Sequence, residues 1–193
     1  MTEKAEEKQY RCPGESYTIS DSVCRGRQRV NYPKCNVCLE KIEPGGFAQS
    51  HAEPKLSINI FKSYDIRGKY RSELNDTTAH KIGTSIALFF REQNPDVKNI
   101  VVGRDMRLSS KSLANALIEG LCTAGLNVIN VGVVSSEMTY FAVGHYKYDG
   151  GVMVTASHNP AEYNGFKLCR EQAIPVSFET GIDRTSKLTK KYH

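Results

Sequence analysis

The sequence contains no apolar run that approaches the roughly 20 residues of a membrane-spanning helix. It also shows no internal repeat and no low-complexity segment. Residues 1–8 are mostly charged, so no secretory signal is expected at this end of the chain. These absences argue against a membrane protein and a repeat array, and they predict a cytoplasmic protein.

The composition places the chain among soluble globular proteins. Hydrophobic residues make up 39% and charged residues 24% of the 193 residues, which is too apolar a balance for a disordered chain. A chain of this length can form one domain with a substantial core and a small appendage.

The net charge of +5 does not by itself indicate nucleic-acid binding. Residues 181–193 hold one acidic and four basic side chains, a sum of +3, so the rest of the chain is only weakly basic. Arg25, Arg27 and Arg29 alternate along the chain without aromatic residues between them on which bases could stack. We interpret them as a solvated basic strand and expect no nucleic-acid partner.

Residues 1–56 are predicted to form a small cysteine-rich segment. It holds four of the six cysteines, Cys12, Cys24, Cys35 and Cys38. Four thiolates can enclose Zn²⁺, but a zinc ribbon brings two close pairs, whereas Cys12 and Cys24 have eleven residues between them. A zinc site and unligated thiols therefore both remain open. A redox dithiol lacks its usual βαβ context, and a disulfide is disfavoured in the cytosol.

Residues 57–180 alternate between strand-like and helical patterns. The patterns predict strands at 57–66, 100–102, 128–134, 152–154 and 166–168, with a turn at Arg67-Gly68. They also predict three helices: one capped by Asp76 or Thr77, a second capped by Ser109, and a third that spans residues 136–146. This alternation predicts a three-layer α/β/α fold with a mostly parallel sheet. Residues 181–193 are expected to be a basic tail that starts a truncated element.

Two cysteines lie within these predicted elements. Cys122 falls in the second helix and Cys169 in the last strand. Both are expected to be buried, small apolar side chains.

A polar loop follows the apolar run Val152-Met153-Val154. Ser157 lies in this loop, and Asn159-Pro160 marks its turn. Ser157 should therefore lie at the carboxyl edge of the sheet, where open α/β sheets bind ligands. A hydroxyl group there can accept a phosphoryl group, although the same residue types also occur in loops that only satisfy the local backbone.

An acyl-transfer nucleophile is the weaker interpretation of Ser157. Ala156 and His158 adjoin it, so the Gly-x-Ser-x-Gly elbow is absent. In extended chain, neighbouring side chains point to opposite sides, so His158 would be badly placed as its base.

Four segments, in order, resemble the α-D-phosphohexomutases, the phosphoglucomutases and phosphomannomutases. They are Phe61–Gly68, Val101–Arg107, Gly150–Pro160 and Glu162–Leu168. The resemblance covers about residues 58–175 and concerns the amino-terminal domain of the family. It implies interconversion of hexose 1-phosphate and hexose 6-phosphate through a phosphoserine and a bisphosphorylated sugar.

The same resemblance assigns roles around the loop. Ser157 would carry the phosphate and bind Mg²⁺ through it, with His158 and Asn159 positioning the phosphate. Lys167 would contact the reacting hydroxyl and assist proton transfer, because an ammonium near a second cation releases its proton more readily. An activator such as glucose 1,6-bisphosphate would load the serine.

A second group of residues would surround the phosphosugar. By resemblance, Tyr64 and Arg67 line the cleft, and arginine suits phosphate because its guanidinium donates two parallel hydrogen bonds. Asp65 is expected to be structural. Arg104 and Asp105 would either brace each other beneath the loop or meet the substrate.

The family's later motifs are missing from this sequence. It has no Asp-Gly-Asp-x-Asp-Arg metal loop and none of the later sugar-recognition or phosphate-clamping loops. The chain therefore resembles the first domain only, is expected to be inactive alone, and would need the remaining mutase domains as partners. A non-catalytic module, with a zinc-binding amino terminus and a mutase-like remnant, is the alternative. The particular hexose is not indicated.

Overall fold

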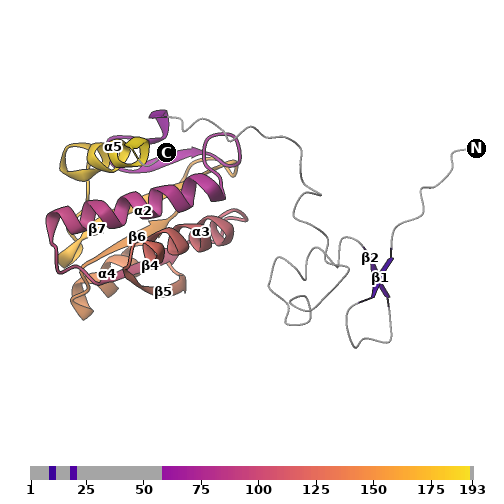
Figure 1. The fold of residues 1–193 in the computed structure, drawn as a ribbon, viewed down its shortest axis with the longest axis horizontal. Coiled ribbons are helices and arrows are strands. Elements are labelled where there is room, and N and C mark those ends of the chain that lie inside the picture. The colour runs from indigo at the N-terminus through magenta and orange to yellow at the C-terminus, as the bar shows by residue number, and fades with distance from the viewer. Residues whose placement is uncertain (1–8, 12–17, 21–57, 192–193) are drawn as a thin grey trace, which may run out of the picture. The chain divides into compact units, whose positions relative to one another are not determined.

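The computed structural model describes residues 9–11, 18–20 and 58–191 (Figure 1). The chain divides into two units, Met1–Glu53 and Pro54–His193. In the first unit, β1 (Gln9–Arg11) and β2 (Thr18–Ser20) pair antiparallel. Cys12, Cys24, Cys35 and Cys38 lie outside the described residues, so the zinc site stays a hypothesis.

A five-stranded sheet forms the centre of the second unit, in the order β3-β7-β6-β4-β5. The strands are β3 (Ile66–Lys69), β4 (Asn99–Arg104), β5 (Asn127–Val133), β6 (Gly150–Val154) and β7 (Tyr163–Arg170). β4 pairs parallel with β5 and β6, whereas β7 pairs antiparallel with β6 and β3. Four strands therefore run in one direction and β7 opposes them, which confirms the predicted α/β fold with a mostly parallel sheet.

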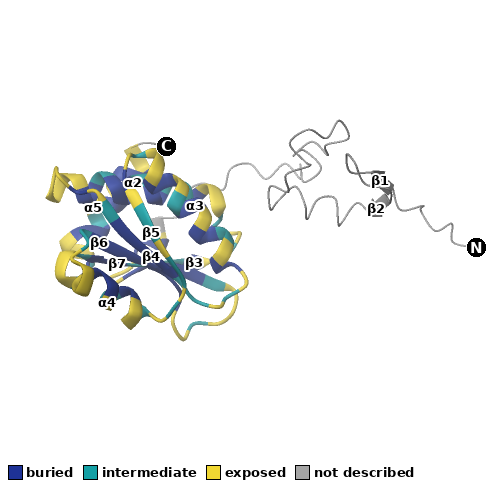
Figure 2. Cartoon of the chain, turned by 90° about the horizontal axis from the view of Figure 1, so that it is seen from below, coloured by how far each residue is buried: buried dark blue, intermediate teal, exposed yellow. Residues whose placement is uncertain are grey.

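Helices cover both faces of this sheet. They are α2 (Asp76–Gln93), α3 (Ser110–Thr123), α4 (Ser136–Tyr146) and α5 (Asp183–Lys191). α2, α3 and α5 share one core with Val152 and Phe166, whereas α4 packs against Val101 and Cys169. Figures 1 and 2 show this layering, with buried residues along the strands and the inner sides of the helices. The two cores follow from the alternation of side chains along each strand.

The backbones of α2 and α3 approach closely at two glycines. A Cβ atom on Gly83 would lie 2.3 Å from the carbonyl oxygen of Leu117. A Cβ atom on Gly120 would lie 2.1 Å from that of His80. These distances are too short for any side chain, so the helix pair depends on glycine at both positions.

The predicted strand at 57–66 and the turn at Arg67-Gly68 are wrong. Ile58–Ile60 form a short 3₁₀ helix, η3, and Arg67-Gly68 lie inside strand β3. β3 pairs with β7 at a point where a Cβ on Gly165 would lie 2.2 Å from the carbonyl oxygen of Ile66. A contact this distant in sequence decides the conformation of the Arg67-Gly68 dipeptide, which by itself resembles a turn.

The helix caps differ in detail from the prediction. Asn75, rather than Asp76 or Thr77, caps α2: its Oδ1 accepts a 2.9 Å hydrogen bond from the backbone N–H of Thr78. Ser109 precedes α3 as predicted, but its side chain makes no capping hydrogen bond.

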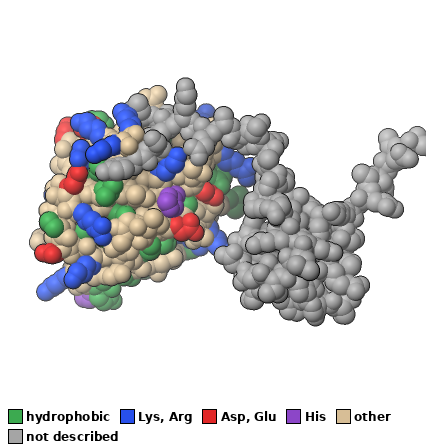
Figure 3. Space-filling model, in the orientation of Figure 1, with side chains coloured by type: hydrophobic (Ala, Val, Ile, Leu, Met, Phe, Trp, Pro, Cys, Tyr) green, Lys and Arg blue, Asp and Glu red, His purple; other side chains and the backbone are tan. Residues whose placement is uncertain are grey.

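The last part of the described chain is a helix that belongs to the same core. The sequence shows residues 181–193 only as a basic stretch, yet Ile182 is 0% and Leu188 3% exposed in the core shared with α2. Figure 3 shows that, on the face of the second unit in view, basic side chains are interspersed with acidic and apolar ones.

None of the helices in the described residues combines the length and hydropathy that a membrane crossing requires.

The two cysteines of the second unit differ in environment. Cys169 is buried, as predicted, whereas Cys122 is exposed, so the expectation for Cys122 is wrong. Burial raises the pKa of the Cys169 thiol to about 12, and a backbone hydrogen bond with Gly151 opposes this only in part. Cys169 therefore remains a protonated thiol in the folded chain.

We expect iodoacetamide at pH 8 to alkylate Cys122 and to spare Cys169, because the thiolate is the reactive species and solvent reaches only the first. Peptide mass spectrometry would measure both sites. Unfolding in denaturant should make Cys169 react as well. Equal labelling of both cysteines in the native chain would contradict the burial of Cys169.

Candidate active site

The loop that holds Ser157 leaves the sheet at the carboxyl end of β6, as predicted. The backbone N–H of Asp105 donates a 3.0 Å hydrogen bond to the carbonyl oxygen of Val154, so the loop after β4 begins beside it. Ser157 is exposed and has a φ of +52°. Residues other than glycine adopt this left-handed conformation at a cost of about 1–3 kcal/mol, so the surroundings must hold it.

Because the backbone at Ser157 is left-handed, the side chains of Ser157 and His158 need not point to opposite sides of the chain. His158 was expected to face away from Ser157 because the chain was taken as extended, and that premise does not hold. His158 is exposed. Asn159 Nδ2 donates a 2.8 Å hydrogen bond to the carbonyl oxygen of Ala156, so its side chain braces the loop. The phosphate-positioning roles of His158 and Asn159 stay predictions.

Arg107 binds the loop more extensively than any residue that the sequence analysis singled out. Its Nη1 donates to the carbonyl oxygens of Pro160 (2.8 Å) and Tyr163 (3.2 Å). Its Nη2 donates to the carbonyl oxygens of Ser157 and Asn159, both at 2.7 Å. One guanidinium therefore gathers four carbonyl oxygens of the loop.

The brace expected between Arg104 and Asp105 joins Arg107 and Asp105 instead. Arg107 Nε donates to Asp105 Oδ2 at 3.2 Å, whereas Arg104 Nη1 contacts only the backbone oxygen of Asp105, at 3.4 Å. Sequence reasoning missed Arg107. The one available signal was its place two residues after Asp105, where the carboxylate also accepts the Arg107 backbone N–H at 3.0 Å.

Thr155 connects the same carboxylate to Ser157. Thr155 Oγ1 donates to Asp105 Oδ2 at 2.7 Å and accepts from the Ser157 backbone N–H at 2.9 Å. The Thr155 residue is only 5% exposed. A buried hydroxyl group that both donates and accepts has its hydrogen-bonding needs met, which stabilises a single arrangement.

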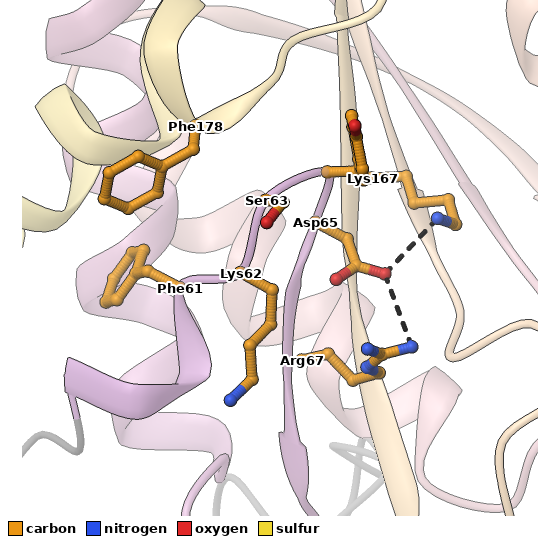
Figure 4. Close-up of a pocket in the computed structure, with 8 residues that line it drawn as sticks. Phe61, Lys62, Ser63, Asp65, Arg67, Lys167 and Phe178 are labelled. Atoms are coloured by element: carbon orange, nitrogen blue, oxygen red, sulfur yellow. Dashed lines mark hydrogen bonds and ion pairs between the residues drawn. The ribbon is translucent and has the colours of Figure 1, made fainter.

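Two cationic side chains, Arg67 and Lys167, lie where β3 pairs with β7, the neighbour of β6 in the sheet. Asp65 Oδ2 lies 3.3 Å from Lys167 Nζ and 3.9 Å from Arg67 Nη1 (Figure 4). Asp65 is 6% exposed, so its carboxylate lies largely out of solvent between two cations. The proton-transfer role expected of Lys167 stays a prediction.

These side chains border a cavity of about 670 Å³. Its lining residues are Phe61, Lys62, Ser63, Tyr64, Asp65, Arg67, Lys167 and Phe178 (Figure 4). Three cations against one carboxylate give the wall a net charge of +2, which favours an anionic ligand. Tyr64, a residue that is 77% exposed, is available to such a ligand.

The structure thus brings Tyr64, Arg67 and Lys167 to one cavity. Ser157, His158, Asn159 and Arg104 are not among its lining residues. The two groups meet at Gly165, which pairs with Arg67 and whose carbonyl oxygen accepts the Thr155 N–H at 2.9 Å. Two strand spacings, roughly 10 Å, therefore separate the backbones of Arg67 and Thr155.

A family model described as phosphoglucomutase/phosphomannomutase, alpha/beta/alpha domain I, matches residues 59–192. The chain belongs to the phosphoglucomutase/phosphomannomutase family. The match includes both the Ser157 loop and the Arg67–Lys167 cavity, so the two groups belong to the family's first domain.

Similar proteins share this region with the mutase-family chain. A phosphomannomutase of Vibrio cholerae is 47% identical over 134 residues, 69% of this chain and 29% of the relative. A protein named phosphohexose mutases, from Xanthomonas campestris, is 47% identical over 127 residues, 66% of this chain and 27% of the relative. The crystal structure of a phosphoglucomutase/phosphomannomutase family protein from Burkholderia thailandensis superposes with a TM-score of 0.64 at 34% identity, covering 71% of this chain and 31% of that one. The chain therefore spans less than a third of the length of these three proteins.

Proposed function

We propose that residues 58–191 form the phosphoserine-bearing domain of a phosphohexomutase, an intramolecular phosphotransferase that interconverts hexose 1-phosphate and hexose 6-phosphate. The observation that carries this proposal is the fixed, exposed Ser157 at the carboxyl end of β6, the neighbour of strand β7, which contributes Lys167 to a cavity with a net positive wall. Names of relatives such as phosphomannomutase support a phosphosugar as the substrate class.

The chemistry proposed for Ser157 is phosphoryl transfer in two directions. The bond between phosphorus and Ser157 Oγ breaks as phosphorus bonds to a free sugar hydroxyl, whose proton leaves to a base. The bisphosphorylated sugar then returns its other phosphoryl group to Ser157. Such transfer needs positioning and cations rather than a strong nucleophile, which fits the arrangement of Arg67 and Lys167.

Lys167 is proposed to contact the reacting hydroxyl. In the resting chain its ammonium pairs with Asp65, so Lys167 would take the proton of the sugar hydroxyl as it passes one of its own protons to the Asp65 carboxylate. Arg67 and Tyr64 would hold the phosphosugar at the same wall, and a free phosphate group suits the arginine fork.

The described residues do not by themselves fit a Mg²⁺ site. Among them, no group of three or more His, Cys, Asp or Glu side chains could hold a metal ion. A phosphate on Ser157 would add oxygen ligands, and Mg²⁺ would require further carboxylates or waters besides. When bound, the ion would neutralise phosphate charge.

The test is the phosphorylation of Ser157. We expect a complete mutase, in which residues 59–192 replace the matching region of the Vibrio cholerae phosphomannomutase, to gain one phosphate on incubation with glucose 1,6-bisphosphate and Mg²⁺, and peptide mass spectrometry should map it to Ser157. The Ser157→Ala variant of this chimaera is the matched control and should gain none. Phosphate at another residue, or an unmodified chimaera, would refute the assignment and favour a non-catalytic module.

A further inference from the structure

The backbone of Ser157 is held on both sides by other side chains. Its N–H donates to Thr155 Oγ1 at 2.9 Å, and its carbonyl oxygen accepts from Arg107 Nη2 at 2.7 Å. The residue between these two contacts has the left-handed φ of +52°. Contacts at both peptide groups restrict the φ and ψ rotations that would otherwise release this conformation.

The geometry of the Arg107 side chain allows it to hold the backbone of the Ser157 loop at several points. Its two terminal nitrogens donate to carbonyl oxygens at both ends of the loop, from Ser157 to Tyr163. The side chain is 15% exposed, so water competes little for these donors. A lysine carries one nitrogen on a flexible stem and cannot reproduce such a planar fork.

Asp105 fixes Arg107 and Thr155 to the rigid part of the fold. Its carboxylate accepts from both of them and from Ser110 Oγ, at the first residue of α3. Asn164 Nδ2 in turn donates to Ser110 Oγ at 2.9 Å, and both residues are 0% exposed. The loop is thus tied through a partly buried polar network to α3 and to β7, and such networks favour one arrangement when their members are paired.

We propose that Arg107 is a positioning residue: together with Thr155 and Asp105 it holds Ser157 in its left-handed backbone conformation and so presents the hydroxyl group in a single orientation. The proposal rests on the proposed function only in so far as Ser157 is the phosphate carrier. Arg107 touches the carbonyl oxygens of the loop and acts through Ser157.

The first experiment measures the loop itself in the full ¹⁵N-labelled chain. Hydrogen exchange of the Ser157 amide and its HN–Hα coupling report the Thr155 hydrogen bond and the φ angle. In Arg107→Ala we expect exchange at Ser157 to accelerate about tenfold or more, with the coupling shifting away from the left-handed value. Arg107→Lys should resemble Arg107→Ala. Arg184→Ala, which removes a two-bond contact with Glu92 on α2, is the matched control and should leave Ser157 unchanged.

Chemical rescue separates positioning from general stability. Guanidinium ion at low millimolar concentration should restore slow exchange at Ser157 in Arg107→Ala, because it can fill the vacated site, whereas sodium chloride at equal ionic strength should not. Thr155→Val gives a second variant that keeps Arg107: exchange at Ser157 should accelerate, while Thr155→Ser should restore it. Amides of β6 report whether each variant remains folded.

The outcomes decide between the proposals. Unchanged exchange and coupling at Ser157 in both Arg107→Ala and Thr155→Val would overturn the positioning role. If instead the complete chimaeric mutase is never phosphorylated at Ser157 while the loop of the chain depends on Arg107, the proposed function fails and the positioning role stands. If Ser157 is phosphorylated, its rate of phosphorylation should fall in Arg107→Ala and recover with guanidinium.

Discussion

Replacing Gly120 with alanine is expected to destabilise the second unit by about 3 kcal/mol, the upper part of the range for overpacking a tight contact. The new Cβ would lie 2.1 Å from the carbonyl oxygen of His80, so α2 and α3 must move apart. The loss should appear as a fall of roughly 10 °C in the midpoint of thermal unfolding followed by circular dichroism.

Gly144→Ala provides the matched control. Gly144 lies in α4, is exposed, and has no atom within 4 Å of the position of a Cβ. The same substitution there should stabilise the chain by about 0.5–1 kcal/mol, because alanine has the higher helix propensity. Equal effects of the two substitutions would show that the contact between α2 and α3 is not as close as described.

The Ser157→Ala variant is expected to lower mutase turnover by about three orders of magnitude or more, because the transferred phosphoryl group then has no acceptor on the protein. The assay requires a complete mutase. Residues 59–192 can replace the corresponding region of the Vibrio cholerae phosphomannomutase, which is 47% identical to this chain over 134 residues. Turnover would be measured as hexose 6-phosphate formed from hexose 1-phosphate.

Ser136→Ala, at the first residue of α4, is the control for this chimaera and should retain turnover. Circular dichroism of each variant would verify the fold. A Ser157→Ala chimaera with turnover close to that of the parent would place the phosphate carrier at another residue.

Local signals in the sequence were sufficient for most of the fold. The span Ser136–Tyr146 was predicted as a helix and is α4, and Ser157 was placed correctly at the end of β6. In these segments, hydrophobic periodicity and turn residues agree with the tertiary structure. The pairing of Arg67-Gly68 in β3 was not indicated, because it depends on β7, about a hundred residues later in the chain. The antiparallel direction of β7 was not indicated either, although its partner β6 ends at Val154, shortly before β7 begins at Tyr163.

The sequence predicted which residues lie at the site better than it predicted which atoms those residues contact. Tyr64, Arg67 and Lys167 were expected in one cleft, and they line one cavity. Arg107 was missed because its partners are backbone carbonyl oxygens 50–56 residues later in the chain, and any residue type supplies a carbonyl. Asp65 was expected to be structural, and it pairs with two of the three cations of the cavity, Arg67 and Lys167.

The position of β3 affects the order in which the nascent chain can fold. β3 is an edge strand of the five-stranded sheet whose neighbour is β7, and Asp65 lies 102 residues before its partner Lys167. At typical synthesis rates, about 5–20 s pass between the two residues. Throughout that interval Ile66, fully buried in the finished sheet, lacks its β7 partner, and the segment presents an unpaired strand to chaperones and to other nascent chains. The cavity wall is therefore completed last, after β4, β5 and β6 have been synthesised.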